Sequence, residues 1–261
     1  MSVIESDALR RAPGAGEGRL PGPGLQPEDP LDVVLRRLNT VVRLDDEERE
    51  LVRDLTGPPT EHRVGADLGD DGDAGCRLLL SGWACRVSET PWGGRQVLDF
   101  VLPGDAVGLS IRPHVEGLYR VVAITRGVSV DARLLRERLR GQIDGVGGLR
   151  LACINLERAA LARMISHTSR LGGASATQAM AHLLLELRSR QAQIGMLQSG
   201  RFPLPLSQEC LHEALGITVT QVYRILTQLR RDGLIVLEPG WCAIPDPALL
   251  AAAGGFKQWR D

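Results

Sequence analysis

Residues 204–246 constrain the fold most tightly, because two short helices and two short strands must follow one another with few connecting residues. Ser207 precedes a helical stretch that ends at Gly216, and Thr218 precedes a second one that continues to about residue 231. Ser and Thr are favoured N-cap residues, and Gly after a helix permits a tight turn. The buried faces are supplied by apolar residues at helical spacing: Leu211, Leu215, Ile217, Val222, Ile225, Leu226 and Leu229. The following GLIVLEPGWCAIPD predicts strand, Pro-Gly turn and strand. Together they predict a helix-turn-helix with a wing.

The second helix of this motif carries the candidate DNA-contacting side chains. A helix in the major groove presents its N-terminal side chains to base edges, and hydroxyl groups near helix starts contact phosphates. Arg224 could donate two hydrogen bonds to guanine, Gln221 could pair with adenine, and Val219 could contact a thymine methyl. Residues 218–231 include three arginines and no acid, which is a local basic footprint. The predicted DNA-binding residues are Ser207, Thr218, Val219, Thr220, Gln221, Tyr223, Arg224 and Arg230.

The composition indicates a globular protein of two modest domains. The chain has 261 residues, of which 43% are hydrophobic and 24% charged, and its net charge of −1 argues neither for nor against nucleic acid. No apolar run is long enough to span a bilayer. Residues 1–30 are polar and rich in Pro and Gly, so we predict a disordered tail and no secretory signal. We expect a cytoplasmic protein that does not contact membranes.

Residues 31–148 are predicted to form one β-rich domain. Two amphipathic helical segments, LDVVLRRLNTVVRL and DDEERELVRDL, are followed by short β-type runs separated by Gly-rich breaks. The predicted strands lie in LLLSGWACRV, RQVLDFVL, GLYRVVAI and VSV, a spacing typical of a small antiparallel barrel or sandwich. Asp131 is a candidate N-cap for the helix that closes this domain.

Residues 149–171 are predicted to form one long helix that pairs with a copy of itself. An apolar seam with three- and four-residue steps is typical of a coiled coil, although Arg158 interrupts it, and an ordinary core helix is the alternative. The seam consists of Ile154, Leu161, Ile165 and Thr168. A further helix, SATQAMAHLLLELRSRQAQIG, opens the C-terminal domain at 172–250. A linker, MLQSGRFPLP, follows it, and residues 251–261 form a tail.

The order of these parts resembles the Crp/Fnr family of bacterial regulators over residues 31–250. The matching segments are LLLSGWACRV (78–87), GGRQVLDFVLPGD (93–105) with Val107-Gly108, RLGGASATQAMAHLLLEL (170–187) and LPLSQECLHEALGITVTQVYRILTQLRRDGLI (204–235). The resemblance implies an α+β chain with an N-terminal cyclic-nucleotide-binding-like β-roll sensor domain, a long dimerisation helix and a C-terminal winged helix-turn-helix domain. It also implies a homodimer that binds a palindromic DNA operator, and contact with RNA polymerase if the protein is an activator.

The chain departs from the family pattern in its DNA-reading and hinge positions. Many members have a basic and an acidic residue early in the recognition helix, where this chain has Val219 and Thr220, so its half-site should differ from theirs. The connector often carries two basic residues, where this chain has Gly173-Ala174, which indicates a looser hinge.

The sensor domain departs from the ligand-binding members as well. Leu109-Ser110 replaces the Gly-Glu of the phosphate cassette, and no Arg-Ser pair follows. Because a bound phosphate needs a charged partner and free backbone N–H groups, we expect that cyclic AMP is not bound tightly. No cysteine precedes residue 76, so an iron-sulfur cluster is not expected.

The remaining reactive side chains show no pattern of a catalytic or ligand-binding site, so we expect no catalytic residues, no metal and no cofactor. Five scattered cysteines lack CxxC spacing, and no histidine shows ligand spacing, so buried reduced thiols and a structural His182 are the simplest interpretation. Oxidation of Cys210, on the first helix of the motif, is an open alternative. No Ser-His-Asp order, P-loop or GxGxxG supports an enzyme. A β-roll interaction module whose helix-turn-helix contacts proteins is the other alternative, but a protein-binding hairpin has no reason to exclude acids from 218–231.

Overall fold

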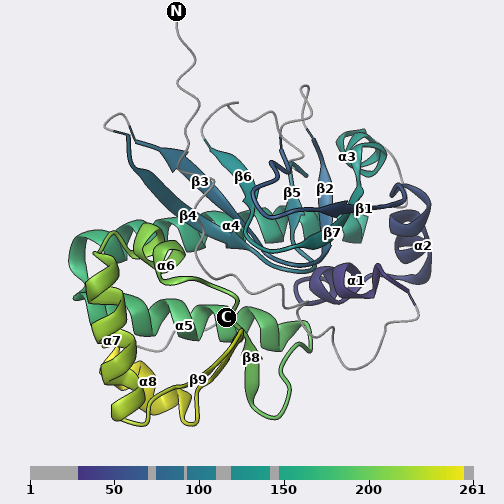
Figure 1. Ribbon diagram of the computed structural model, residues 1–261. Coiled ribbons are helices and arrows are strands. Elements are labelled where there is room, and N and C mark those ends of the chain that lie inside the picture. Colours follow the sequence, from purple (N-terminus) through teal and green to yellow (C-terminus); the bar gives the residue numbers. More distant parts are fainter. Residues whose placement is uncertain (1–28, 70–74, 91–92, 110–118, 142–146, 256–261) are drawn as a thin grey trace, which may run out of the picture.

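The computed structural model describes residues 29–69, 75–90, 93–109, 119–141 and 147–255 (Figure 1). The predicted α+β class is confirmed: a β-rich N-terminal domain is followed by one long helix and a helical C-terminal domain with its own small sheet. Most of the expected disordered tail lies outside the described residues. Its last part is not loose, because Asp29 accepts a 2.6 Å bond from Arg53 Nε and a 2.9 Å bond from the Leu31 backbone N–H.

Two antiparallel sheets form the N-terminal domain. The first has the strand order β1 (Pro59–His62), β7 (Gly127–Asp131), β2 (Arg77–Ser81) and β5 (Ala106–Val107). The second has the order β4 (Arg95–Val101), β3 (Ala84–Glu89) and β6 (Arg120–Ala123). Their facing sides share a cluster that includes Leu79, Ala84 and Val101. Strand β1 was not predicted, because its sequence PTEH has no apolar alternation and its side chains are exposed or half-buried.

Helices cover the outer face of the four-stranded sheet. They are α1 (Asp32–Asn39), α2 (Asp46–Asp54), α3 (Arg133–Arg140) and the first part of α4 (Gly147–Gly173), which share a cluster with Leu78 and Val130. The first predicted helix is shorter than its apolar pattern, although Val41 and Val42 still pack against this cluster. The prediction of Asp131 as an N-cap was wrong: Ala132 is the N-cap, and Asp131 accepts a 2.8 Å bond from the Arg133 N–H.

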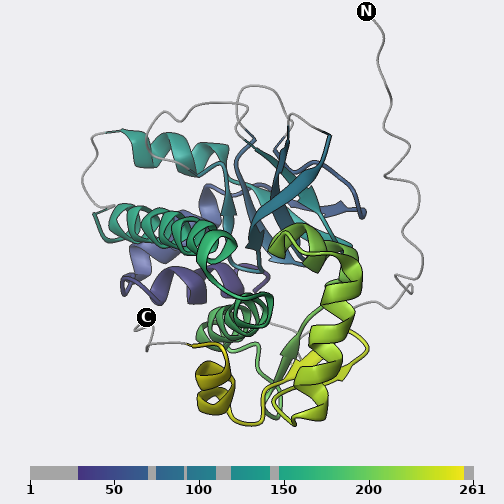
Figure 2. The ribbon, with the colours of Figure 1, turned by 90° about the vertical axis from the view of Figure 1, so that its left-hand side faces the viewer.

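The predicted long helix is confirmed as α4, which runs two residues further at each end than expected. Its 27 residues span about 40 Å and connect the two domains (Figure 2). Only Ala174 and Ser175 separate it from α5 (Ala176–Gln193), and the Ser175 side chain caps that helix. Among the helices described, none is both long and apolar enough to cross a membrane.

The C-terminal domain contains the predicted motif together with two unpredicted pieces. Its elements are α6 (Gln208–Leu215), α7 (Val219–Arg231), α8 (Pro247–Ala253) and a sheet of order β8 (Arg201–Pro203), β10 (Trp241–Ala243) and β9 (Val236–Glu238). Strand β8 lies in the segment predicted to be a linker, where it pairs Phe202 with Cys242 and buries Phe202 completely. Helix α8 ends three residues beyond the expected domain boundary at 250.

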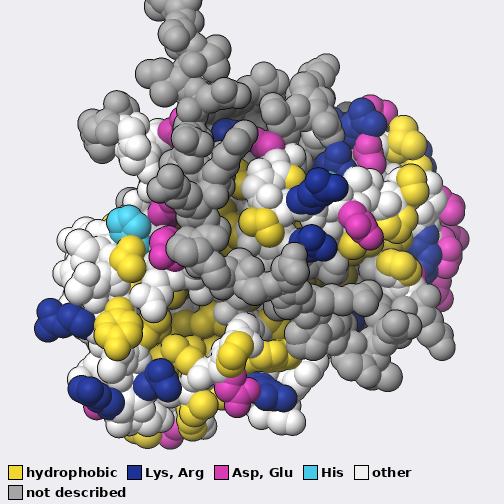
Figure 3. Space-filling model, in the orientation of Figure 1, with side chains coloured by type: hydrophobic (Ala, Val, Ile, Leu, Met, Phe, Trp, Pro, Cys, Tyr) yellow, Lys and Arg dark blue, Asp and Glu magenta, His cyan; other side chains and the backbone are white. Residues whose placement is uncertain are grey.

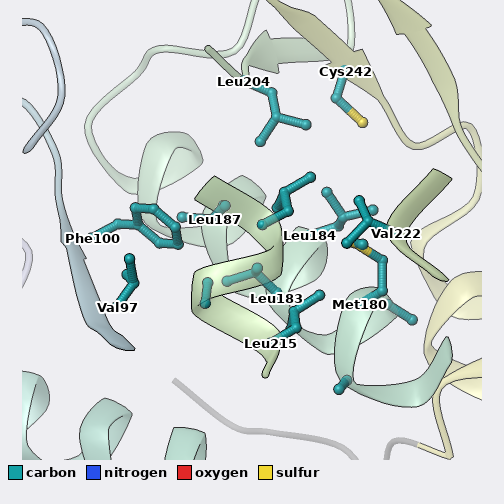
Figure 4. Packing of buried hydrophobic residues seen from close by; sticks show 14 of the residues in the cluster. Val97, Phe100, Met180, Leu183, Leu184, Leu187, Leu204, Leu215, Val222 and Cys242 are labelled. Atoms are coloured by element: carbon teal, nitrogen blue, oxygen red, sulfur yellow. The ribbon is translucent and has the colours of Figure 1, made fainter. Parts of the chain in front are cut away.

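The sheet of β4, β3 and β6 in the N-terminal domain is buried on both faces. One face packs against the four-stranded sheet, and the other contributes to a second cluster with α5, α6 and α7 of the C-terminal domain (Figure 4). In that cluster Val97 and Phe100 of β4 join Leu183 and Leu187 of α5 and Leu215 of α6. The two domains therefore share one hydrophobic core.

Candidate nucleic-acid interface

The turn between α6 and α7 is built as the sequence predicted. Gly216 ends α6 in the left-handed region, at φ 64° and ψ 27°, and its N–H donates to the His212 carbonyl at 2.9 Å. A side chain there would be strained and would come within 3.3 Å of Leu171 on α4. Ser207 and Thr218 are the N-caps of α6 and α7. The two helices are thus held in a compact helix-turn-helix.

Helix α7 separates a buried face from an exposed one. Val222, Ile225 and Leu229 are buried against the rest of the domain. Val219 and Tyr223 are 36% and 59% exposed, an unusual position for apolar and aromatic side chains. All eight predicted DNA-contacting residues are exposed: Ser207, Thr218, Val219, Thr220, Gln221, Tyr223, Arg224 and Arg230. The sequence therefore identified the outward face of α7.

Gln221 is engaged in a way that the sequence pattern did not anticipate. Its side-chain oxygen accepts from the Thr218 backbone N–H at 2.9 Å and from the Thr218 hydroxyl at 3.1 Å, which completes a capping box. Pairing with adenine requires both the oxygen and the nitrogen of the amide. Gln221 can make that pair only by giving up its part in the cap, which in this structure holds the start of α7.

The exposed face of α7 is positively charged. Segment 218–231 carries three arginines and no acid. Within the part of the chain that the structure describes, the side chains of Arg224 and Arg230 form no ion pair or hydrogen bond. Figure 3 shows Lys and Arg side chains over this helix at the lower left of the molecule. These cations are available to DNA without first leaving a protein partner.

The wing is held beside its turn by a side chain of β8. Strands β9 and β10 form the predicted hairpin, and Gly240 adopts φ 75° in its turn. Arg201 of β8 pairs with Glu238 at 2.8 Å and lies 5.3 Å from the centre of the Trp241 ring. Sequence reasoning missed Arg201, because its partners are some forty residues away in the chain and no local pattern joins them.

Comparisons with known proteins agree with this geometry. Residues 178–253 match the family model of the Crp-like helix-turn-helix domain. The nitrogen fixation regulation protein FixK of Bradyrhizobium diazoefficiens is 29% identical over 162 residues, which cover 62% of this chain and 66% of FixK. The transcriptional activator protein FnrL of Cereibacter sphaeroides is 32% identical over 163 residues, which cover 61% of this chain and 64% of FnrL. The chain spans just under two thirds of the length of these two relatives.

Solved structures show the same fold. FixK2 from Bradyrhizobium japonicum superposes with a TM-score of 0.63 at 21% identity, covering 78% of this chain and 98% of FixK2. A CRP/FNR-family transcriptional regulator from Thermus thermophilus superposes with a TM-score of 0.55 at 18% identity, covering 77% of this chain and all of that one. The chain therefore has the fold of the Crp/Fnr regulators and carries a Crp-like helix-turn-helix domain.

Helix α4 carries an apolar stripe that is largely exposed. Leu161 and Ile165 are 58% and 59% exposed, while Ile154 is half-buried. Thr168 is exposed, and its hydroxyl donates to the Met164 carbonyl at 2.9 Å. Leu151, three residues before Ile154, is 48% exposed and extends the stripe. The same spacing could have identified Leu151 from the sequence.

The cysteines of this chain are free thiols. Four are buried and Cys210 is half-buried. Burial raises the pKa of Cys85 to about 12, and burial also raises the pKa of Cys210, so both thiols are poor nucleophiles at neutral pH. Across the described ranges, no group of three His, Cys, Asp or Glu side chains could hold a metal ion.

Proposed function

We propose that this chain is a sequence-specific DNA-binding regulator that acts in the cytoplasm as a homodimer on a palindromic operator. The observation that carries the proposal is the exposed, acid-free face of α7, on which Tyr223 and Arg224 lie together. A protein-binding hairpin would gain nothing from excluding acids there. Two such helices, set about one helical turn of DNA apart, fit the two half-sites of a palindrome. An activator of this kind would also contact RNA polymerase.

The dimer forms along α4 in this proposal. Exposed Leu161 and Ile165 lie one turn apart and need an apolar partner, and a second copy of the same helix supplies one. Leu161→Glu should convert the dimer to a monomer in sedimentation analysis and abolish binding to a full palindrome. Leu134→Glu, the same change at an equally exposed position on α3, outside the proposed seam, is the control and should remain dimeric.

Selection from a randomised DNA pool tests the function directly. Wild type should enrich a palindrome, and Arg224→Ala should not, because Arg224 is the strongest candidate for base recognition. Arg231→Ala removes the same charge at the far end of α7, so it should enrich the wild-type motif more weakly. Failure of wild type to enrich any motif would refute the proposal and favour protein contacts.

The signal for the β-roll is proposed to be something other than cyclic AMP. Leu109 replaces the Gly of the Gly-Glu pair in ligand-binding relatives, and its side chain is 7% exposed within the cluster under α1 and α3, where it would fill space near the cassette. Ser110 and the rest of the cassette region lie outside the described residues. Millimolar cyclic AMP should change operator affinity by less than about twofold, whereas a tight cyclic AMP effector would change it by about 5-fold or more.

A further inference from the structure

The two domains of this chain are joined by more than the covalent connection between α4 and α5. Strand β4 of the sensor domain contacts α6, the first helix of the helix-turn-helix. The Gln96 side-chain amide donates to the Glu213 carbonyl at 2.7 Å and to the Ala214 carbonyl at 3.4 Å. The last carbonyls of a helix lack partners within it, so Gln96 satisfies groups that would otherwise need water. Arg95 adds an ion pair with Glu213 at 3.7 Å.

Arg190 of α5 makes the second polar attachment. Its Nη1 lies 3.3 Å from Asp99 Oδ1, and its Nη2 lies 2.6 Å from Asp105 Oδ2. The same Nη2 donates to the Phe100 carbonyl at 2.8 Å. Arg190, Asp99 and Asp105 are between 5% and 8% exposed. One guanidinium from the DNA-binding domain is therefore buried between two carboxylates of the sensor domain.

The carboxylates keep their charge in this buried position. Burial alone raises the pKa of Asp99, but Arg163, Arg190 and Arg86 together outweigh it and hold the pKa below its usual value. A buried ion pair adds little net stability, because desolvation offsets the attraction, but it penalises arrangements that leave a charge unpaired. Such pairs are suited to fixing an orientation.

The attachment is also separable. Without Arg190, Asp99 would still hold Arg86 at 2.7 Å and Arg163 at 3.2 Å. Asp105 would still hold Arg37 at 3.0 Å. These three arginines belong to the sensor domain or to α4, so they remain when the C-terminal domain moves. Undocking therefore leaves no buried carboxylate without a cation, while Arg190 becomes hydrated.

The position of Arg190 gives it leverage over the whole C-terminal domain. Ala174 and Ser175 form the only covalent link between α4 and α5. Arg190 lies fifteen residues after Ser175, which is about 22 Å along α5. The hinge alone would leave the domain free to rotate. Gln96 and the shared hydrophobic cluster restrict that rotation, and Arg190 adds a charged contact at this distance that favours one orientation.

We propose that Asp99, Asp105 and Arg190 form a clamp that fixes the orientation of the DNA-binding domain against its own sensor domain. They are positioning residues: they do not touch DNA, but they set the spacing at which the two recognition helices of a dimer meet the operator. A change in the β-roll that shifts β4 then reaches the recognition helix directly, in addition to any change along α4. The DNA-binding test of the clamp rests on the proposed function, because it requires that the protein binds an operator.

The first test measures how strictly the protein demands one half-site spacing. Operators selected by wild type are remade with one or two base pairs added or removed between the half-sites, and each base pair turns one half-site by about 35°. We expect wild type to lose about tenfold or more in affinity for altered spacings, and Arg190→Gln to lose less than about threefold, because its domains are no longer pre-oriented. Arg86→Gln is the matched control: it also removes one guanidinium from Asp99, but within the sensor domain, and should keep the wild-type penalty.

The second test reports on the clamp without DNA. Nitroxide labels on Leu134→Cys of α3 and Leu249→Cys of α8, both highly exposed positions, measure the distance between the domains by pulsed EPR, with excess unlabelled chain so that pairs within one protomer dominate. Wild type and Arg86→Gln should give one narrow distribution and Arg190→Gln a broad one. If wild type selects no operator but these distributions differ as expected, the proposed function fails and the clamp stands.

A folded Arg190→Gln protein with a narrow distance distribution and the wild-type spacing penalty would overturn the clamp. If Arg190→Gln does not fold, Arg190→Lys replaces it. Lys keeps the charge but cannot span both carboxylates, because it lacks the planar fork of Arg. For the clamp to stand, Arg190→Lys must lose less affinity than wild type when the half-site spacing is altered, and its EPR distance distribution must be broader. Wild-type values in both measurements would equally overturn the clamp.

Discussion

The arginines of α7 and those around Asp99 are the same side chain in two opposite environments. Arg224 and Arg230 are exposed and, among the described residues, make no ion pair. Arg190 is buried and the Arg163 side chain is only 12% exposed, and each contacts Asp99. The difference lies in the acids: residues 218–231 contain none, whereas β4 and the turn after it supply Asp99 and Asp105. Arginines without a protein partner are available to an external polyanion, and arginines paired with buried carboxylates orient domains.

Loss of a buried arginine should have the largest effect. Arg190→Ala removes the guanidinium's hydrogen bonds to two carboxylates and to the Phe100 carbonyl. We expect the free energy of unfolding to fall by about 3 kcal/mol, because several hydrogen bonds of a charged group are lost together. Urea unfolding followed by circular dichroism measures this. Arg231→Ala, an exposed change of the same kind, should change stability by less than about 0.5 kcal/mol. Equal stability of the two variants would break the comparison.

Loss of an exposed arginine should reverse this pattern. Arg224→Ala is expected to weaken binding to the selected operator by about 10- to 100-fold, because a bidentate contact to guanine discriminates by about 1–3 kcal/mol. Its unfolding midpoint should match wild type, since Arg224 has no intramolecular partner to lose among the described residues. Fluorescence anisotropy with operator and scrambled DNA checks the first effect. A variant that binds both DNAs as wild type does would remove Arg224 from the interface.

The stability of the protein should depend on pH through His182, which lies beside the buried Arg170. Burial first, and the Arg170 guanidinium second, lower the pKa of His182 from 6.5 to about 4. Between these values the unfolded chain binds a proton that the folded chain does not, so stability falls as the pH decreases from about 6.5 to 4. Allowing for its partial exposure, we expect His182→Gln to reduce that loss by about 1 kcal/mol. Unfolding at pH 7 and pH 4, with the exposed His212→Gln as control, measures it; an unchanged loss in His182→Gln would contradict the expectation.

The smallest effect should come from an exposed arginine near the end of α7. Arg230→Ala should weaken binding to operator and scrambled DNA by similar factors and reduce the salt dependence, the slope of log K against log salt, by about 1. Affinities measured at several salt concentrations test this. A loss confined to the operator would instead assign Arg230 to base recognition.

The sequence predicted the helix-turn-helix well because its signals are local. Gly216 and Thr218 mark the turn within three residues, and the apolar spacing around Val222 separates the buried and exposed faces of α7. The stripe on α4 was predicted for the same reason. The capping role of Gln221 was not predicted, and its contact with DNA stays a prediction, because the capping box competes with base pairing for one amide group.

Long-range partners were not predictable from these patterns. Arg190 lies 91 residues from Asp99 and 85 from Asp105, so no spacing rule brings them together. Strand β8 is three residues long and depends on pairing with β10, whose sequence is forty residues away. Asp99 itself sits in an apolar run that indicates a buried strand, and only the fold shows which cations surround it.

The core shared by the two domains limits how this protein can be recombined. Grafting the C-terminal domain onto the β-roll of another family member would leave Leu183 and Leu187 of α5 without the Val97 and Phe100 side chains they pack against, and Arg190 without both of its carboxylates. A working chimera must therefore carry β4 and α5 from the same parent, although residue 175 looks like the natural place to cut. Substitutions on these two elements are expected to accumulate in pairs as such proteins diverge.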